Sequence, residues 1–144
     1  MVIHFLIYGV VGWCTEIVWT AVHDALRARR RGERIDPRLA GRTYLWMFPI
    51  YGGGGLAFEV VHAGVIGWPW VARGLLYMVG CFAVEYASGW AIERATGRVP
   101  WDYSSTRWNV HGLIRLDYAP AWFAFGMLLE RVENVVRVIE GCVR

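Results

Sequence analysis

The hydrophobic positions of this chain fall into long runs and not into the narrow stripes of soluble amphipathic helices. Residues 2–26, 44–71 and 72–92 each contain only two to four Asp, Glu, Arg or His residues. A helix rises 1.5 Å per residue, so about 20 residues cross a hydrocarbon core of about 30 Å. A soluble helical bundle is the alternative, but its surface helices would carry a polar face. The pattern therefore predicts three membrane-spanning helices.

A fourth hydrophobic run is weaker. Residues 119–129 are apolar, and beyond them charged residues alternate with a helical stripe of Val and Ile. We interpret this region as a fourth span that emerges as an amphipathic helix; a surface-lying or re-entrant helix is the alternative. The expected fold is an all-α polytopic membrane protein, with a single domain over residues 1–144. Its predicted spans are residues 2–26, 44–67, 70–93 and 116–136.

The distribution of charge predicts the orientation of these spans. All 15 basic residues are Arg, seven of them in residues 27–42, one (Arg73) near the second connection, and four in or beside the third connection. Connections rich in Arg stay in the cytoplasm. We therefore expect the first and third connections to be cytoplasmic and the amino terminus to be outside, in a bacterial inner membrane. The net charge of +3 is a signal of topology and does not argue for nucleic-acid binding.

Three acidic residues lie within separate predicted spans: Glu16, Glu59 and Glu85. A central acidic residue opposes insertion by about 2.5–3.5 kcal/mol, and each large apolar residue returns only about 0.3–0.6 kcal/mol. A glycine lies four residues from each Glu, and small residues let helices approach closely. We therefore expect the three carboxylates to converge in one polar site, which is the default role of ionisable groups in a membrane. The alternative is that they hold the helices together without binding anything.

The stretch "FPIYGGGG", Phe48–Gly55, allows two interpretations. Pro49 and the glycine run weaken a helix, so the backbone is either irregular and lines a cavity or packs closely against a neighbouring helix. The run lacks the Lys and Ser/Thr of a phosphate-binding loop. Glu59 and His62 have the Glu-x-x-His spacing of di-iron bundles, but only one such pair exists. We therefore expect neither a metal nor a cofactor.

The segment between the third and fourth runs, residues 99–120, is polar and aromatic. Asp102 and Asn109 are good turn formers, and Trp101, Tyr103 and Trp108 can anchor the segment at the membrane interface. We expect an ordered loop that folds back and closes the cytoplasmic side of the carboxylate site. The alternative is an interfacial belt that only seats the protein.

The motifs "GWCTE", "LWMFPIYG", "PWDYS" and "GLIRLDYAPAWF" give the chain a family resemblance. It resembles the eukaryotic transmembrane protein 229 family and its bacterial relatives, catalogued as "putative ABC-transporter type IV" membrane proteins, over nearly its whole length. The resemblance implies a multi-pass helical fold. It carries motif positions over to Gly12, Glu16, Arg42, Pro49, Tyr51, Gly52, Glu59, Glu85, Trp101, Asp102, Tyr103, Ser104, Asn109 and Gly112. These 144 residues contain no ATP-binding motif, so a transport role implies a separate ATPase.

The resulting functional hypothesis is a transport-related, permease-like or lipid- or solute-binding membrane subunit. The expected binding residues are Glu16, Glu59, Glu85, Arg42, Tyr51, Trp101, Asp102, Tyr103 and Asn109. The expected partners are membrane lipid and either a second copy of the chain or a membrane or ATPase subunit, with no nucleic acid. An intramembrane enzyme acting on a lipid headgroup and a non-catalytic assembly protein are the alternatives.

Overall fold

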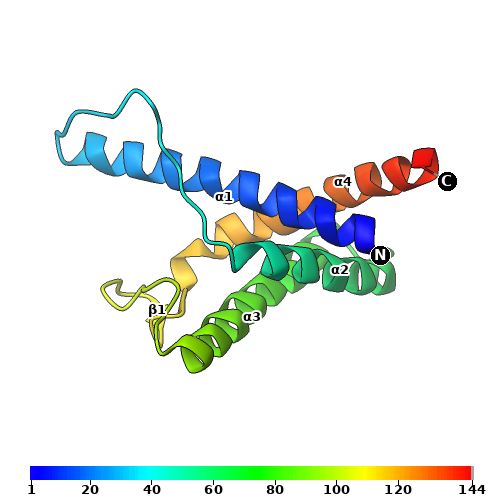
Figure 1. Ribbon diagram of the computed structural model, residues 1–144. Helices are drawn as coiled ribbons and strands as arrows, with labels where there is room; N and C mark the ends of the chain where they lie inside the picture. The colour runs from blue at the N-terminus through cyan, green and yellow to red at the C-terminus, as the bar shows by residue number, and fades with distance from the viewer. Residues whose placement is uncertain (144) are drawn as a thin grey trace. The chain divides into compact units, whose positions relative to one another are not determined.

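A computed structural model describes residues 1–143, which are mostly helical (Figure 1). The four helices are α1 (Val2–Arg30), α2 (Met47–Val65), α3 (Trp70–Thr96) and α4 (Ala119–Val143). Between α3 and α4 lie two short strands, β1 (Asn109–Val110) and β2 (Ile114–Arg115), and the 3-10 helix η1 (Leu116–Tyr118). The chain divides into two compact units, one up to Leu56 and one from Ala57 onward.

Two of the helices that the structure describes, α1 and α3, are long and apolar enough to cross a membrane. Few of the residues in their apolar stretches are buried, whereas the core helix of a soluble protein would be buried on most sides. Side chains such as Val18 and Val79 are more than half exposed. These features are typical of a helical membrane protein, and the crossing of the membrane by each helix stays a prediction.

In the first unit the connection after α1 runs back along that helix (Figure 1). The Thr20 hydroxyl accepts a hydrogen bond from the Arg42 backbone N–H at 2.8 Å and donates to the Arg42 carbonyl at 3.0 Å. Further along, the Trp13 indole donates to the Tyr44 carbonyl at 3.1 Å. These bonds satisfy backbone groups of a segment that has no regular structure of its own.

The glycine run belongs to a regular helix, so the interpretation as irregular backbone is wrong and the close-packing alternative is correct. Pro49 lies in the first turn of α2, where the missing N–H has no helical partner to lose. Four aromatic rings from α1 and α2 each lie over a glycine of the other helix. The contacts are Phe5 on Gly52, Tyr8 on Gly55, Phe48 on Gly9 and Tyr51 on Gly12. A Cβ added at Gly12 or Gly55 would lie 2.1 or 2.2 Å from a ring carbon, so only glycine fits.

This packing predicts opposite effects for two glycines of the same run. Gly55→Ala is expected to destabilise the protein by about 1–3 kcal/mol, because the new Cβ overlaps the Tyr8 ring. Gly53→Ala meets nothing within 4 Å and is expected to stabilise α2 by up to about 1 kcal/mol. Denaturant unfolding of both variants in detergent micelles measures the difference. Equal changes in the free energy of unfolding would contradict the packing.

The second unit is organised around α3 and α4, which pack side by side. Arg73 near the start of α3 bonds Glu130 far along α4, whereas Glu85 faces Trp122 near the start of α4, so the helices are antiparallel. Gly126 allows the close approach, because a Cβ there would lie 2.4 Å from the Cβ of Tyr77. The last two turns of α2 add Phe58 and Val65 to a small core around Tyr77.

The strands β1 and β2 form a two-stranded antiparallel hairpin that an all-α prediction did not include. The turn carries two adjacent residues with positive φ, His111 at 53° and Gly112 at 71°, which is the conformation that tight hairpins require. The Leu113 N–H closes the turn on the Val110 carbonyl at 3.0 Å. The loop between α3 and α4 is therefore folded and not a simple linker.

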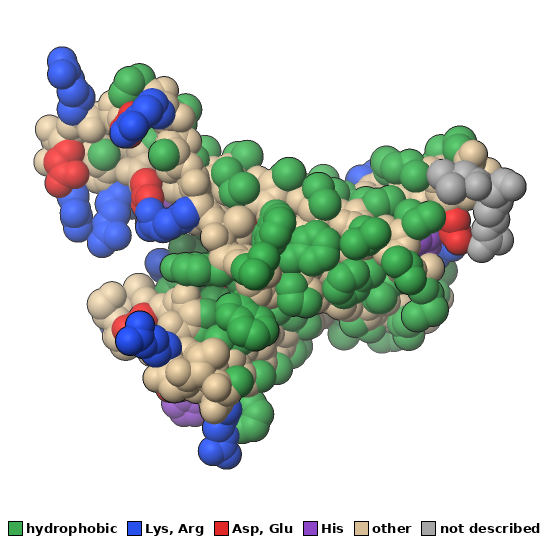
Figure 2. Space-filling view, viewed as in Figure 1, with side chains coloured by type: hydrophobic (Ala, Val, Ile, Leu, Met, Phe, Trp, Pro, Cys, Tyr) green, Lys and Arg blue, Asp and Glu red, His purple; other side chains and the backbone are tan. Residues whose placement is uncertain are grey.

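Side chains segregate by type along each unit (Figure 2). Hydrophobic side chains cover the helices, whereas in the first unit the Arg side chains gather at the end of α1 and in the loop that follows. In the second unit, charged side chains gather around the hairpin and the adjacent end of α3. This separation is what the positive-inside rule expects of a membrane protein.

Candidate functional site

Polar residues lie at two levels along α3 in the second unit. Arg73 and Tyr77 are four residues apart and therefore share one side of the helix, whereas Glu85 lies about two turns further along. At 1.5 Å per residue, Tyr77 and Glu85 lie about 12 Å apart along the axis. The second unit therefore holds two separate polar centres on α3.

The first centre, which we call the Glu85 site, consists of Glu85, Tyr103 and Trp122. The Tyr103 hydroxyl donates to Glu85 Oε1 at 3.1 Å. Trp122 faces the same carboxylate, but among residues 1–143 neither Glu85 Oε2 nor Trp122 Nε1 completes a hydrogen bond with good geometry, and both atoms are buried. One oxygen of this carboxylate is thus held, and the other is unsatisfied.

The loop around the hairpin positions Tyr103 over Glu85. Asp102 accepts a hydrogen bond from the Ser104 N–H at 2.8 Å, which is the turn that short Asp side chains favour. Asn109 donates to the Thr106 carbonyl at 2.6 Å and accepts from the Gly112 N–H at 3.0 Å. These bonds give Asp102 and Asn109 a structural role in shaping the loop.

Two aromatic contacts tie the loop to α3. The Trp101 indole donates to the Leu113 carbonyl at 2.8 Å, and its ring lies beside Gly89, where a Cβ would approach to 3.1 Å. The hydroxyl of Tyr86 lies 2.8 Å from His111 Nδ1. The loop therefore folds back over the last three turns of α3.

Arg115 reinforces the loop next to Tyr103. Its guanidinium bonds both oxygens of Asp117, at 2.9 and 2.5 Å, and stacks on the Tyr118 ring at 4.2 Å from the centroid. The bond from Arg115 holds the pKa of Asp117 below its ordinary value of 3.8. Burial raises the pKa of Tyr103, so its hydroxyl stays protonated and remains a donor to Glu85.

The loop is expected to loosen in acid. Hydrogen bonds with Ser104 lower the pKa of Asp102, as Arg115 lowers that of Asp117. A carboxylate whose folded pKa is lowered stabilises the fold above its unfolded pKa and loses that contribution as pH falls through the folded pKa. The amide protection factors of residues 99–118, which are exchange rates corrected for the intrinsic effect of pH, should therefore be constant from pH 7 to about 5 and fall below about pH 3.8. Unchanged protection at pH 3 would contradict both ionic turns.

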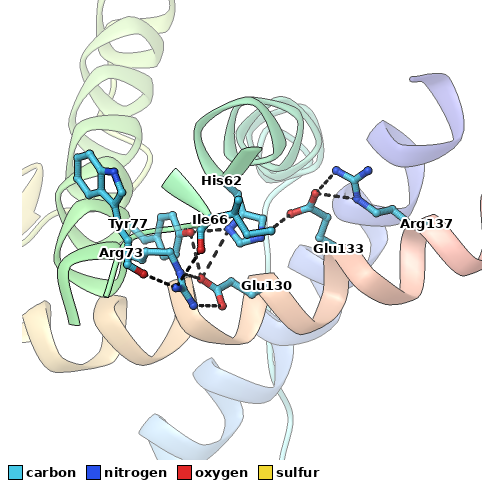
Figure 3. Close-up of polar contacts among 8 residues, drawn as sticks. His62, Ile66, Arg73, Tyr77, Glu130, Glu133 and Arg137 are labelled. Atoms are coloured by element: carbon cyan, nitrogen blue, oxygen red, sulfur yellow. Dashed lines mark hydrogen bonds and ion pairs between the residues drawn. The ribbon is translucent and has the colours of Figure 1, made fainter. Parts of the chain in front are cut away.

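The second centre lies near the turn between α2 and α3, and we call it the His62 network (Figure 3). Arg73 forms a two-pronged ion pair with Glu130, Nε to Oε1 at 2.7 Å and Nη2 to Oε2 at 3.1 Å. It also donates to the Trp68 carbonyl at 2.6 Å, which ties the turn to α3. The Arg73 and Glu130 side chains are 17% and 13% exposed. This pair is largely desolvated. Removal of one partner from such a pair strongly destabilises the folded protein, because the other charge stays buried.

Tyr77 and His62 extend the network toward α4. The Tyr77 hydroxyl donates to Glu130 Oε1 at 3.1 Å and lies 2.6 Å from His62 Nδ1. On its other side, His62 Nε2 lies 3.8 Å from Glu133 Oε2. Glu133 is 2% exposed, and its Oε1 accepts from the Nε of Arg137 at 2.9 Å.

The predicted binding residues of the first unit form two separate contacts. Glu16 accepts a hydrogen bond from the Thr43 hydroxyl at 2.6 Å and also bonds Tyr51. Arg42 pairs with Asp24 at 2.9 Å. Glu16 thus bonds to hydroxyl groups, and Arg42 pairs with Asp24 and not with Glu16.

In the second unit the structure brings Glu85 together with Tyr103, and Glu59 is half-buried on α2. Glu16 belongs to the other unit, so the convergence of all three carboxylates stays a prediction. The sequence did not predict the His62 network, which consists of His62, Arg73, Tyr77, Glu130, Glu133 and Arg137. The spacing of Glu130, Glu133 and Arg137 by three and four residues was the available signal, because such residues share one helix face.

The chain was compared with known protein families and solved structures. Residues 3–140 match the family described as "Putative ABC-transporter type IV". The chain belongs to this family. The match covers both polar centres and confirms the resemblance to the bacterial family that was drawn from the sequence motifs. No solved structure matches the chain.

Proposed function

We propose that the protein is the membrane-embedded subunit of a transport-related complex, and that the Glu85 site binds the amine-bearing part of a solute or lipid headgroup. The observation that supports this most is Glu85 Oε2, which is buried and completes no hydrogen bond of good geometry among residues 1–143, although the Trp122 indole faces the same carboxylate. A carboxylate oxygen without a well-aligned donor in apolar surroundings is unfavourable. A protonated amine supplies a mobile donor and the opposite charge.

Tyr103 makes the site selective and closable in this proposal. The loop that carries it reaches Glu85 from the end of α3 and covers the carboxylate. A ligand on that side has to displace the loop or enter beside Trp122. The loop is therefore the gate of the proposed site, and Trp101 and Asn109 keep it folded.

The proposed partners follow from family membership and from the sequence. A transport-related subunit without an ATP-binding motif needs a separate ATPase, and four helices rarely enclose a pathway alone, so a second copy or another membrane subunit completes it. The Arg-rich ends of each unit favour a cytoplasmic position for the loops after α1 and α3, with the amino terminus outside a bacterial inner membrane.

The test uses the full chain in nanodiscs made from equal parts of phosphatidylethanolamine and phosphatidylglycerol. Mass spectrometry of the retained lipid measures binding of a lipid headgroup amine. Equilibrium binding of ethanolamine measures binding of a free amine in solution. Glu85→Gln is expected to weaken binding in one of these two measurements about tenfold or more, because a hydrogen bond to a charged group contributes about 1.5–3 kcal/mol. The matched control is Glu93→Gln, an exposed position two turns further along α3.

The outcomes separate the possibilities clearly. Retention of phosphatidylethanolamine that depends on Glu85 supports a lipid-binding subunit, and Glu85-dependent ethanolamine binding supports a solute-binding one. Equal amine binding by Glu85→Gln and Glu93→Gln would overturn the proposal. A change in lipid mass between cells with and without the protein would favour the lipid enzyme instead.

A non-catalytic assembly role is the second candidate, and the His62 network favours it. Glu130 is fully satisfied by Arg73 and Tyr77, as a carboxylate that only joins helices would be. The discriminating variant replaces Glu16, Glu59 and Glu85 together by Gln. An assembly protein keeps its function in this variant, whereas a binding or transport protein loses it while remaining folded.

A further inference from the structure

The end of α1 and the loop after it carry more positive charge than their acidic residues can pair (Figure 2). Residues 24–42 contain seven Arg and only three acidic residues. Three of the Arg lie 2.8, 2.9 and 3.9 Å from these acids. The other four are exposed and have no carboxylate within ion-pair distance among residues 1–143: Arg27, Arg29, Arg30 and Arg34. Their charge is therefore left for a partner outside this unit.

The length of α1 relates these Arg residues to the depth of lipid headgroups. The helix has 29 residues and is about 43 Å long at 1.5 Å per residue, whereas a hydrocarbon core is about 30 Å thick. Counted from Val2, about 20 residues fill that core. Trp19, which is 47% exposed, then lies near its edge, where Trp rings are favoured. If α1 crosses the membrane, its last two turns therefore lie among the headgroups.

The loop after α1 returns along the same helix to the level of Thr20. Gly41 packs directly on the helix backbone, because a Cβ there would overlap the Ile17 carbonyl oxygen. The backbone of Arg42 exchanges two hydrogen bonds with the Thr20 hydroxyl. The loop that carries Arg34 is therefore held beside the last turns of α1, at the same depth.

Leu39 is held in this loop in a conformation that a bulky residue rarely adopts. Its φ is 47°, and its N–H bonds the Asp36 carbonyl at 3.0 Å. Its side chain is 55% exposed, and that of Ile35 is 40% exposed. Together with Arg34 they line a hollow of about 230 Å³ between the loop and α1, whose helix wall is largely alanine. Apolar side chains beside unpaired guanidinium groups suit the boundary between phosphate groups and acyl chains.

We propose that an exposed surface of the first unit binds anionic phospholipid, on the premise that α1 crosses the membrane. This Arg surface consists of Arg27, Arg29, Arg30, Arg34, Ile35 and Leu39. The guanidinium groups donate to phosphate oxygens, and the two apolar side chains contact the upper part of the acyl chains. Asp24 and Asp36 also line the hollow, but each is already bonded to an Arg, so neither leaves an unpaired negative charge.

The chemistry of the Arg surface differs from that of the proposed amine site. Glu85 belongs to the other unit and would bind a cation, whereas the Arg surface binds the negative charge of a lipid. An acidic partner protein is the competing occupant. The depth of the four Arg and the exposed apolar side chains among them favour lipid.

The test compares phosphatidylglycerol with phosphatidylcholine of the same acyl chains, by native mass spectrometry of the full chain in detergent micelles. Phosphatidylglycerol has a net negative charge and phosphatidylcholine has none, so the wild type is expected to bind the first about tenfold more tightly. Replacement of all four unpaired Arg by Gln should abolish this preference, because each Arg near an anionic lipid surface contributes about a factor of five. The control variant removes the same charge from exposed positions of the second unit and should keep most of the preference. Its substitutions are Arg94→Gln, Arg98→Gln, Arg107→Gln and Arg131→Gln.

Leu39→Asn separates contact with lipid from stability of the loop. Asn adopts positive φ more readily than Leu, so the midpoint of thermal unfolding without added lipid should not fall. The affinity for phosphatidylglycerol should fall about threefold, because the apolar contact is lost. A fall in the midpoint with unchanged affinity would contradict the role of Leu39 in lipid contact.

Two results would overturn the inference. One is a wild type that binds both lipids equally, which would leave the Arg surface to an acidic partner protein. The other is equal binding of phosphatidylglycerol by the two fourfold variants. The first result needs no substitution, so it decides the question even where a variant does not fold. Phosphatidylglycerol carries no amine, so neither result depends on whether Glu85 binds one.

Discussion

Arg73→Leu is expected to lower the midpoint of thermal unfolding by about 10 °C, because it leaves the Glu130 carboxylate unpaired at only 13% exposure. Glu130→Leu should have a similar effect, since it leaves the Arg73 guanidinium without its carboxylate partner. The double variant Arg73→Leu/Glu130→Leu removes both charges and should recover most of the loss, because apolar replacement of a whole buried pair is often neutral or stabilising. Circular dichroism of the three variants in detergent micelles measures the cycle.

The matched control for this cycle is Arg94→Leu, an exposed Arg near the other end of α3. Surface substitutions usually change stability little, so its midpoint should stay within about 2 °C of the wild type. A double variant as unstable as either single variant would contradict the expectation. It would mean that the tie from Arg73 to the Trp68 carbonyl, and not the ion pair, holds the α2–α3 turn.

The second large effect is expected at Trp101. Trp101→Ala removes the half-buried ring beside Gly89 and the hydrogen bond to the Leu113 carbonyl. We expect a loss of about 2–3 kcal/mol, less than the 3–5 kcal/mol of a fully buried Trp. The loop should then open more often, and amide protection of residues 99–118 should fall about 30-fold or more.

Trp108→Ala is the control, because this ring lies in the same loop and is 58% exposed. Its loop amides should remain protected. Trp101→Phe should give an intermediate result, since it keeps most of the ring contact and loses only the indole hydrogen bond. Equal amide protection of residues 99–118 in the Trp101→Ala and Trp108→Ala variants would show that the hairpin stays folded without Trp101. Trp101 would then not be what attaches the hairpin to α3.

Most of the helical fold follows from the hydrophobic runs. The predicted spans begin within about three residues of α1, α2, α3 and α4 because the apolar runs have clear edges. The helix ends are less well predicted, since α1 continues through Arg27–Arg30, where Ala and Arg are good helix formers. The hairpin escaped prediction because strands of two residues are too short to show an alternating pattern.

The site was predictable only where one residue in each contact was ionisable. Glu16 and Glu85 were proposed because they lie in apolar runs, and their observed partners include two Tyr hydroxyls, of Tyr51 and Tyr103. A hydroxyl can also satisfy a carboxylate, and the pattern of charges in the sequence does not indicate which hydroxyl does so. The His62 network was missed because the charged residues after position 129 were interpreted as part of an amphipathic helix end, although Arg73 on α3 is the partner of Glu130.

The interlocked rings and glycines of the first unit restrict how this segment can vary. An aromatic ring that packs directly on a glycine backbone leaves no space for an added methyl group, and neither a rotamer change nor a small shift of the ring creates that space. A gain of bulk at Gly55 is therefore tolerable only with a matching loss at Tyr8. Related chains that differ at one residue of a ring–glycine pair should therefore also differ at the other residue, so that a larger side chain on one helix is matched by a smaller one on the other.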